Sequence, residues 1–376
     1  MIFRIIMNLN KNLDLSKFSK KKIVVGVSGG VDSSVTLALL KEKGFDPIAV
    51  YLQIPVWNSK TNCFEVSGNS LKNIEVIKNI CLKLKINYYI LDTSKDFEKI
   101  VINYFLKEYK SIRTPNPCVF CNRYFKFKYL LDFANKNKIY FIATGHYSKI
   151  LFSKKENTYK LYKAKDNFKD QSYGLSLLTS NQLKRIKFPL GNYSKKQIYL
   201  FAEKYNFNIF KNERQSQDIC FLKNSNVNDY LSKNIPKKKG PIIDLKNNCV
   251  GKHNGLFLYT IGQRRGIGLS KISYVYRFDI SKNQLIITNN KDDIKCTEVY
   301  LKDYNFINNI ILTKPENFMC KIRYKHDACK AKIFPPINHK LKVVFSKPQS
   351  LVATGQYFVF YKKNWCVGCG VVENYN

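Results

Sequence analysis

The chain has 376 residues, of which 45% are hydrophobic, and it carries a formal net charge of +37. This length accommodates two or three domains with packed cores, and the lack of any run of 18 apolar residues argues against a membrane-spanning helix. The charge permits a polyanionic partner such as RNA, although a general richness in Lys, Asn, Ile and Tyr explains part of it.

Eleven cysteines are scattered along the chain, an odd number that does not suggest a framework of structural disulfides. The stretch from Met1 to Met7 is apolar but short, and it lacks a small-residue cleavage site, so no secretory signal is predicted. We therefore expect a cytoplasmic protein with no membrane partner, whose cysteines are reduced thiols with chemical or packing roles.

Residues 1–20 are expected to form a basic, weakly ordered leader. After it, apolar runs typical of buried strands alternate with segments of helical periodicity. Strands are predicted at residues 23–27, 47–54, 87–91 and 139–144, and helices at 33–43, 70–84, 94–110 and 124–136. This alternation predicts a parallel, Rossmann-like sheet with helices on both faces, in an α/β domain over residues 21–207. Ligands of such sheets bind at the carboxyl ends of the strands.

The remaining chain has a different pattern. Residues 148–153 and 158–163 are predicted to form a hairpin, and a capping box from Ser194 to Gln197 opens a helix that runs to residue 205. A small central domain is expected over 208–274, with a turn or linker at 237–241. Over 275–376, short strands at regular spacing predict a small closed β-barrel. The strands of this pattern lie at residues 274–280, 284–288, 320–323, 341–345, 357–361 and 366–372.

Residues 26–33 spell Gly-Val-Ser-Gly-Gly-Val-Asp-Ser between the first predicted strand and helix. Two glycines at this turn let the backbone approach an anion closely, and the helix N-terminus adds free N–H groups and its positive dipole end. Asp32 stands where it could hold a magnesium ion. The stretch lacks the Gly-Lys-Ser/Thr ending of a Walker A loop. It resembles the PP-loop of ATP pyrophosphatases, which cut ATP between the α and β phosphates; an ordinary glycine turn is the alternative.

A second motif, residues 113–122, contains Cys118 and Cys121. Its two prolines predict a stiff loop rather than a helix, with both thiols just ahead of a helix that begins near Arg123. The dipole of that helix, with the nearby Arg113 and Arg123, would favour the thiolate form. The pair is compatible with redox or nucleophilic chemistry, with half of a metal site, or with two incidental cysteines.

A third motif, residues 215–221, contains Cys220. Taken alone, a single cysteine of this kind is more often a buried core residue than a reactive one. It could nevertheless meet Cys121 in space.

Together these motifs resemble those of the tRNA-specific 2-thiouridylases, enzymes that thiolate the wobble uridine of certain tRNAs. The resemblance covers residues 21–374. Its matching stretches are 26–33, Thr114–Pro117 with Cys121-Asn122, Ala143–Tyr147, Lys169–Tyr173, Ser216–Phe221, Tyr259–Arg264, Arg323-Tyr324 and Thr354–Gln356. Cys118 stands where many members have Asp, Gln215 replaces an acidic residue, and Gly174 replaces Phe.

The resemblance implies the roles of individual residues. Cys121 would be the nucleophile, and Cys220 would carry a persulfide. The ATP site would comprise Gly26, Val27, Ser28, Gly29, Gly30, Val31, Asp32, Ser33, Leu52 and Gly145. Asn116, Pro117 and Cys118 would meet the target base, and further tRNA contacts would come from His146, Lys169, Asp170, Gln171, Arg323, Tyr324 and Gln356.

The implied reaction uses ATP and Mg²⁺, the anticodon stem-loop of a tRNA, and a protein that donates persulfide sulfur. Adenylation would turn the C2 oxygen of uracil, a poor leaving group, into AMP. Sulfur from Cys220 would then replace it, and a Cys121–Cys220 disulfide would remain to be reduced.

Several alternatives stay open at this point. A [4Fe–4S] cluster on Cys118, Cys121 and Cys220 could handle the sulfur instead of a persulfide. The Cys366–Cys369 pair could complete a zinc site with the second motif, although packing in a barrel strand is the simpler interpretation, and no other metal site is predicted. Different PP-loop chemistry, such as a ligase that adenylates a carboxylate, or a basic RNA-binding module with a vestigial nucleotide loop, are the rival functions.

Overall fold

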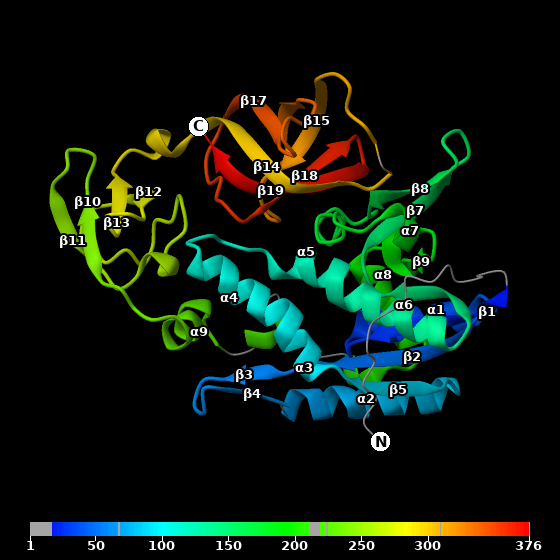
Figure 1. Ribbon diagram of the computed structural model, residues 1–376. Coiled ribbons are helices and arrows are strands. Elements are labelled where there is room, and N and C mark those ends of the chain that lie inside the picture. The colour runs from blue at the N-terminus through cyan, green and yellow to red at the C-terminus, as the bar shows by residue number, and fades with distance from the viewer. Residues whose placement is uncertain (1–16, 67, 211–218, 223–224, 309, 376) are drawn as a thin grey trace.

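A computed structural model describes residues 17–66, 68–210, 219–222, 225–308 and 310–375. Most of the expected leader over 1–20 therefore lies outside the described residues, as do residues 215–218 of the third motif. Figure 1 shows an α/β unit in blue to green, a small β unit in yellow-green and a barrel in orange and red. In the part of the chain so described, no helix is long and apolar enough to cross a membrane.

The first unit is built on a five-stranded parallel sheet, which confirms the predicted α/β class. Its strands are β1 (Ser19–Val27), β2 (Asp46–Gln53), β5 (Tyr88–Asp92), β6 (Ile139–Thr144) and β9 (Ile186–Lys187). They lie in the order β5-β2-β1-β6-β9, and neighbouring strands pair in parallel. The chain moves outward from β1 to β2 and β5, then returns to place β6 on the other side of β1. The strand order thus reverses between β1 and β6. Ligands of such sheets usually bind at this point, beyond the carboxyl ends of the strands.

Helices cover both faces of this sheet because the side chains of β1 alternate between two cores. Ile23 and Val25 pack with α1 (Val31–Glu42), α2 (Gly68–Leu84) and α8 (Lys195–Lys204), whereas Val24 packs on the opposite face with residues of α6 (Phe127–Lys136). The side chains of Ile23, Val24 and Val25 are all completely buried. The sheet is therefore a rigid platform for the loops at its carboxyl edge.

Two long helical segments each contain a π turn. The first runs through α3 (Ser94–Phe97), the π turn η2 (Glu98–Ile102) and α4 (Asn103–Lys110), over the predicted range. The second runs through α5 (Pro117–Cys121), the π turn η3 (Asn122–Lys126) and α6.

The predicted loop at 117–121 is therefore wrong, and these residues begin a helix. Pro117 occupies the first helical position, where no N–H is needed. The side-chain oxygen of Asn116 caps this helix by accepting from the N–H groups of Cys118 at 3.2 Å and Val119 at 3.4 Å.

The second unit contains a four-stranded sheet in the order β11-β10-β13-β12. Its strands are β10 (Gly240–Ile243), β11 (Cys249–His253), β12 (Tyr274–Asp279) and β13 (Gln284–Thr288), preceded by α9 (Val227–Asn234). The strands predicted at 274–280 and 284–288 belong here and not to the barrel, since β13 pairs in parallel with β10. A separate hairpin, β3 (Val56–Asn58) with β4 (Cys63–Glu65), lies beside the first unit.

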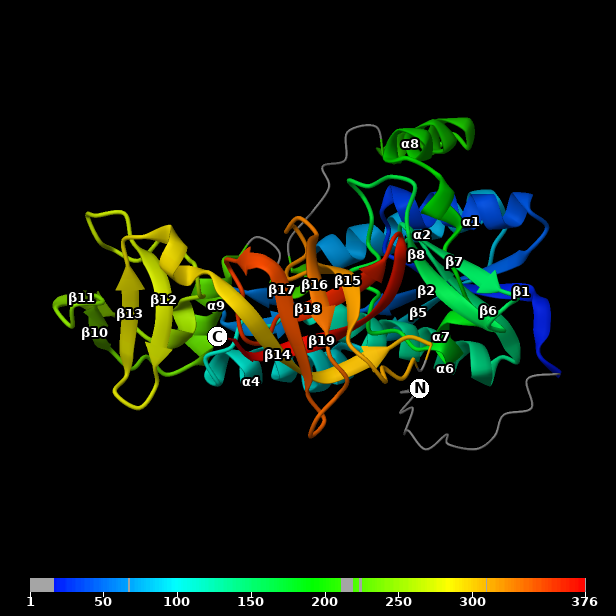
Figure 2. The same cartoon turned by 90° about the horizontal axis from the view of Figure 1, so that it is seen from above.

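The third unit is the closed barrel that the sequence predicts. Its strands are β14 (Cys296–Phe306), β15 (Glu316–Lys321), β16 (Cys329–Ile333), β17 (Leu341–Gln349), β18 (Tyr357–Lys362) and β19 (Trp365–Tyr375). They follow the order β14-β17-β16-β15-β18-β19, and pairing of β14 with β19 closes the ring. The predicted hairpin, β7 (Ser148–Ser153) with β8 (Thr158–Lys163), extends this sheet because β8 pairs with β19 (Figure 2).

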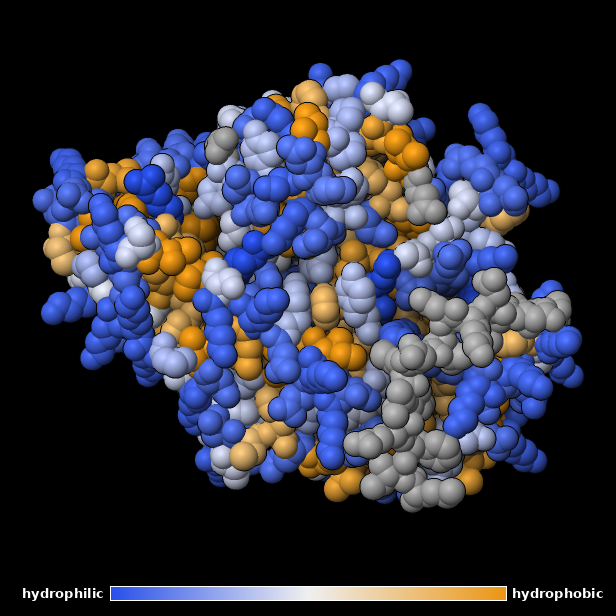
Figure 3. Space-filling model, viewed as in Figure 1, coloured by the Kyte–Doolittle hydropathy of each residue, from blue (hydrophilic) through white to orange (hydrophobic). Residues whose placement is uncertain are grey.

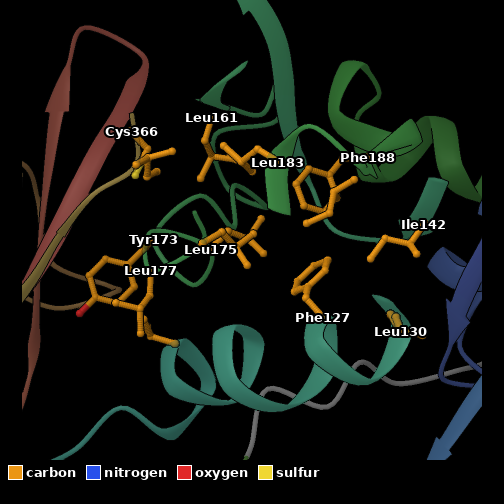
Figure 4. Packing of buried hydrophobic residues seen from close by; sticks show 14 of the residues in the cluster. Phe127, Leu130, Ile142, Leu161, Tyr173, Leu175, Leu177, Leu183, Phe188 and Cys366 are labelled. Carbon is orange, nitrogen blue, oxygen red and sulfur yellow. The ribbon is translucent and has the colours of Figure 1, made fainter. Parts of the chain in front are cut away.

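One buried cluster joins the α/β unit to the barrel. Figure 4 shows Leu175 and Leu177 between Cys366 of β19, on the barrel side, and Phe127 of α6. Cys366 and Cys369 are both completely buried in this apolar cluster. Their surroundings favour the packing interpretation of this pair over a zinc site.

Candidate active site

The turn between β1 and α1 is shaped to receive an anion. Gly29 has φ of +82°, and a Cβ there would lie 2.8 Å from Cβ of Asn73, so a side chain does not fit. Gly30 is the N-cap of α1, and no described side chain caps the first turn. Hydrogen bonds within the turn stabilise it instead. Oγ of Ser33 donates to the Gly30 carbonyl at 3.0 Å and accepts from the N–H of Ser28 at 3.2 Å. Backbone N–H groups at this helix end are therefore open to a ligand.

The ends of two neighbouring strands lie beside this turn. Gly145 follows β6, and a Cβ there would lie 2.9 Å from the carbonyl carbon of Asp32 and 3.0 Å from the nitrogen of Ser33. A glycine is thus what allows β6 to approach the start of α1. Leu52 lies near the end of β2, one residue beyond Tyr51, which pairs with Val27. The predicted ATP residues from all three strands consequently share one edge of the sheet.

Asp32 accepts two hydrogen bonds on the same carboxylate oxygen. The Tyr147 hydroxyl and the Lys195 ammonium each lie 2.6 Å from Oδ1. Burial, followed by the charge of Asp32, raises the pKa of Tyr147, so its hydroxyl remains a donor. Lys195 opens α8 and is not among the site residues that the sequence predicts. The carboxylate expected to hold magnesium thus already has a cation beside it.

The three motif cysteines gather at one place. Cys118 and Cys121 lie one turn apart in α5, and Cys220 begins the short 3₁₀ helix η6 (Cys220–Leu222). Phe221, next to Cys220, packs in the same aromatic cluster as Cys121. The Cys220 thiol also interacts electrostatically with the thiols of Cys121 and Cys118. Cys220 thus lies close to Cys118 and Cys121, although it is distant from them in sequence.

Loss of contact with water is the largest influence on the pKa of these thiols, and it raises the pKa of each. Burial raises the pKa of Cys121 to about 11 and that of Cys220 to about 12, although the Cys220 side chain reaches the surface. Burial also raises the pKa of Cys118, which is likewise exposed at the surface. The pKa of each thiol is thus raised, contrary to the expectation that their surroundings favour the thiolate.

The two arginines expected to favour the thiolates are engaged elsewhere. Nε of Arg113 forms an ion pair with Glu108 at 2.8 Å, and Nη1 of Arg123 donates to the carbonyl of Leu177 at 2.7 Å. Both contacts hold the guanidinium groups in structural roles. The positive charge that lowers the pKa of the cysteines comes from another residue, Lys126.

That cation is Lys126, whose charge lowers the pKa of Cys118, Cys121 and Cys220 against the larger effect of burial. It ends the π turn η3, in which residues five apart are hydrogen-bonded neighbours on one face. Regular α-helical spacing would place a residue five positions after Cys121 on a different face, so the sequence pattern gives no signal for this contact. Lys126 also interacts with His146.

His146 connects the thiols to the nucleotide turn. It follows Gly145 directly, its Nδ1 lies 2.6 Å from Oγ1 of Thr144, and its ring packs against those of Phe127 and Phe188. Burial, and secondly the charge of Lys126, lower its pKa well below the usual value, so the ring is neutral at physiological pH.

Some residues expected to contact tRNA use their side chains inside the protein. Asp170 accepts from the Ala164 N–H at 2.9 Å, and Gln171 accepts from the Tyr147 N–H at 2.9 Å. The Gln356 side chain is 9% exposed and donates to the backbone of the second motif. These three residues shape the surroundings of the site, and their contacts with tRNA stay a prediction.

Other residues of that group lie nearer the surface. Lys169 is half-buried, and Tyr324 is 40% exposed and interacts electrostatically with Cys118. Arg323 donates from Nη2 to the Ile261 carbonyl at 3.2 Å, while its buried Nε has no partner among the described residues. Tyr324 thus brings the barrel to the same place as the thiols.

The described part of the chain contains no group of three His, Cys, Asp or Glu side chains arranged to hold a metal ion. Cys118, Cys121 and Cys220 are close enough to interact electrostatically but do not form such a ligand set. The described residues thus show no ligand set for the alternative iron–sulfur cluster.

A parallel sheet with an open PP-loop at its switch point defines an α/β nucleotide-binding enzyme of the PP-loop class. Known families match along the chain: a "tRNA methyl transferase HUP domain" over residues 21–224, a "tRNA methyl transferase PRC-barrel domain" over 228–289 and an "Aminomethyltransferase beta-barrel domain" over 296–372. The chain belongs to the tRNA-specific 2-thiouridylase family, as its motifs predict.

Two relatives illustrate the membership. The tRNA-specific 2-thiouridylase MnmA of Acetivibrio thermocellus is 39% identical over 360 residues, which cover 94% of this chain and 100% of the relative. The MnmA 1 protein of Caldanaerobacter subterraneus is 40% identical over 358 residues, covering 94% and 98%. Among solved structures, the NMN synthetase of Francisella tularensis has 16% identity and a TM-score of 0.33, over 56% of this chain and 71% of that chain.

Proposed function

We propose that this protein is an ATP-dependent sulfurtransferase that converts the wobble uridine, position 34 of tRNA, into 2-thiouridine. The observation that carries the proposal is the continuity of the site. Lys126 acts on the three thiols and on His146, and His146 adjoins Gly145, which lies against the start of α1. This continuity supports a site at which one substrate base meets both the nucleotide and the sulfur chemistry.

In the first step, the C2 oxygen of uracil attacks the α-phosphorus of ATP. The bond from that phosphorus to the oxygen bridging the β-phosphate breaks, pyrophosphate leaves with the electron pair, and the N3 proton is released. The free N–H groups at the start of α1 stabilise the negative charge that develops on pyrophosphate. The base reaches this point by leaving the anticodon stack, which requires little energy in a loop.

Magnesium fits the carboxylate of this turn. Oδ1 of Asp32 is engaged by Tyr147 and Lys195, so Oδ2 would hold the ion, together with phosphate oxygens, as Mg²⁺ prefers. Magnesium supplies charge neutralisation of the phosphates when bound. Tyr147 meanwhile keeps the carboxylate oriented.

In the second step, sulfur replaces the activated oxygen. The terminal sulfur of a Cys220 persulfide, delivered by a donor protein, bonds to C2, and AMP leaves with the former C2 oxygen. The thiolate of Cys121 then attacks Sγ of Cys220, which breaks the sulfur–sulfur bond, releases 2-thiouridine and leaves a Cys121–Cys220 disulfide. A dithiol reductant restores both thiols. The shared position of Cys121 and Cys220 supports this relay.

The surface suits an RNA substrate. Figure 3 shows hydrophilic side chains spread across the visible face, with hydrophobic patches between them, and the net charge is +37. Lysines near a phosphate backbone gain affinity by releasing counterions. The anticodon stem-loop is the part of tRNA that would bind here.

Mass spectrometry of nucleosides from treated tRNA tests the proposal. With ATP, Mg²⁺ and a persulfide donor, we expect 2-thiouridine at position 34 and release of pyrophosphate only when tRNA is present. Cys121→Ser and Cys220→Ser should abolish the product, whereas Cys118→Ser should retain part of it. Cys249→Ser, a matched control at an exposed cysteine of β11, should retain all of it. Complete loss with Cys118→Ser as well, together with iron and acid-labile sulfide in the anaerobic protein, would indicate the cluster mechanism. Pyrophosphate release without any thiolated base would instead favour a different ligase.

A further inference from the structure

Lys195 is a cation at the nucleotide turn that the reaction described above leaves without a task. Its ammonium pairs with Oδ1 of Asp32 at 2.6 Å, and its side chain is only 12% exposed. The aromatic ring of Tyr199 lies 5.1 Å from the ammonium, and that of Tyr147 lies 6.0 Å from it. Asp32 is the second residue of α1, so Lys195 is held next to the open N–H groups of that helix.

The position of Lys195 is unfavourable for its own helix. A cation in the first turn opposes the helix dipole, and the first turn of α8 contains no acidic residue to compensate. The backbone nevertheless fixes Lys195 firmly. Ser194 and Gln197 form the predicted capping box, and the Lys195 N–H donates to Oδ2 of Asp166 at 2.9 Å. A structural role of α8 alone does not require a lysine there.

We propose that Lys195 is a further ATP-positioning residue, which holds Asp32 while the site is empty and donates to the phosphates once ATP binds. This inference rests on the proposed function, since it takes the β1–α1 turn as the ATP site. Tyr147 remains hydrogen-bonded to Asp32 and keeps the carboxylate in place when the lysine turns away.

Charge and hydrogen-bonding capacity support this exchange. An ammonium has three N–H donors, and the ion pair with Asp32 uses one of them. Without the lysine, an approaching triphosphate would face the negatively charged Asp32 carboxylate. Like charges that come close together repel strongly where solvent screening is weak. A lysine that passes from the carboxylate to the phosphates removes this repulsion. It also leaves Asp32 free to hold a metal ion.

Binding of ATP, measured by calorimetry with Mg²⁺ and without tRNA, tests the proposal. Lys195→Met should weaken ATP binding by about tenfold or more, as expected for a hydrogen bond to a charged group, and Lys195→Arg should restore part of it. AMP, which lacks the β and γ phosphates, should bind both proteins alike. Lys204→Met is the matched control, because Lys204 also lies on α8 and pairs with Glu42 of α1 at 2.7 Å; its ATP affinity should match that of the unaltered protein.

A double-mutant cycle with Asp32→Asn separates a phosphate contact from a structural ion pair. If Lys195 acts on the phosphates, Lys195→Met still weakens ATP binding in the Asp32→Asn background. If the lysine serves only to neutralise Asp32, its removal has no effect there, and the proposal is overturned, as it is if Lys195→Met binds ATP normally. Unaltered protein that does not bind ATP at all would contradict the proposed function instead.

Discussion

Gln356 donates a hydrogen bond from Nε2 to the carbonyl oxygen of Thr114 at 2.8 Å. The N–H of Thr114 in turn donates to the Thr354 carbonyl at 2.8 Å. Gly355 lies between the two barrel residues with φ of +88°, and a Cβ there would lie 3.1 Å from the Thr114 nitrogen. The turn before β18 therefore holds the segment that leads into the cysteine helix α5.

Replacing Gln356 with Leu should destabilise the protein. The substitution leaves the half-buried Thr114 carbonyl without its donor, and an unsatisfied buried group costs about 1–3 kcal/mol. Urea denaturation should show a free energy of unfolding reduced by about that amount. An unchanged midpoint, with weakened tRNA binding, would instead assign Gln356 to RNA contact alone.

Gly145→Ala should impair nucleotide binding. Its Cβ would meet the backbone of Asp32 at 2.9 Å, which forces β6 away from the start of α1. ATP affinity in calorimetry should fall severalfold or more. Gly68→Ala is the matched control, since no atom lies within 4 Å of a Cβ at that position, and it should bind ATP normally. Equal affinity in both variants would show that ATP binding does not need the close approach of β6 to the start of α1.

Lys126→Met should make Cys121 less reactive. Loss of the positive charge removes an effect that lowers the pKa of this thiol, and each unit of pKa increase reduces the thiolate about tenfold at neutral pH. The rate of alkylation by iodoacetamide, followed by peptide mass spectrometry across pH 7–10, should shift to higher pH. Lys126→Arg should restore the profile. Lys128→Met, whose lysine pairs with Asp132, should leave it unchanged.

Sulfur transfer should accelerate with pH. Because burial raises the pKa of Cys121 to about 11, the fraction of the Cys121 thiolate that attacks the Cys220 persulfide grows up to tenfold per pH unit below that value. Single-turnover formation of 2-thiouridine from adenylated tRNA should therefore rise continuously between pH 7 and pH 9. A plateau near pH 7.5 would mean that a thiolate already exists in the folded protein.

The sequence predicts what depends on local pattern. The strand at 23–27, the capping box at Ser194 and the order of the motifs all follow from periodicity and short spacings. Lys195 escapes such analysis because its partner, Asp32, is distant in sequence and meets it only through packing of α8 on α1. Lys126 escapes because a π turn changes which residues share a face. The prediction at Pro117 is wrong because proline disrupts the interior of a helix but is favoured at its first position.

The pairing of β8 with β19 has a consequence for synthesis of the chain. A ribosome delivers the hairpin of residues 148–163 well before its neighbour, Trp365–Tyr375. Until the last strand emerges, β8 presents unpaired N–H and C=O groups, the kind of edge on which nascent chains associate wrongly. We expect a fragment that stops before the barrel to aggregate. Before β19 is synthesised, the charges of lysines along β7 and β8 should hinder association at the unpaired edge.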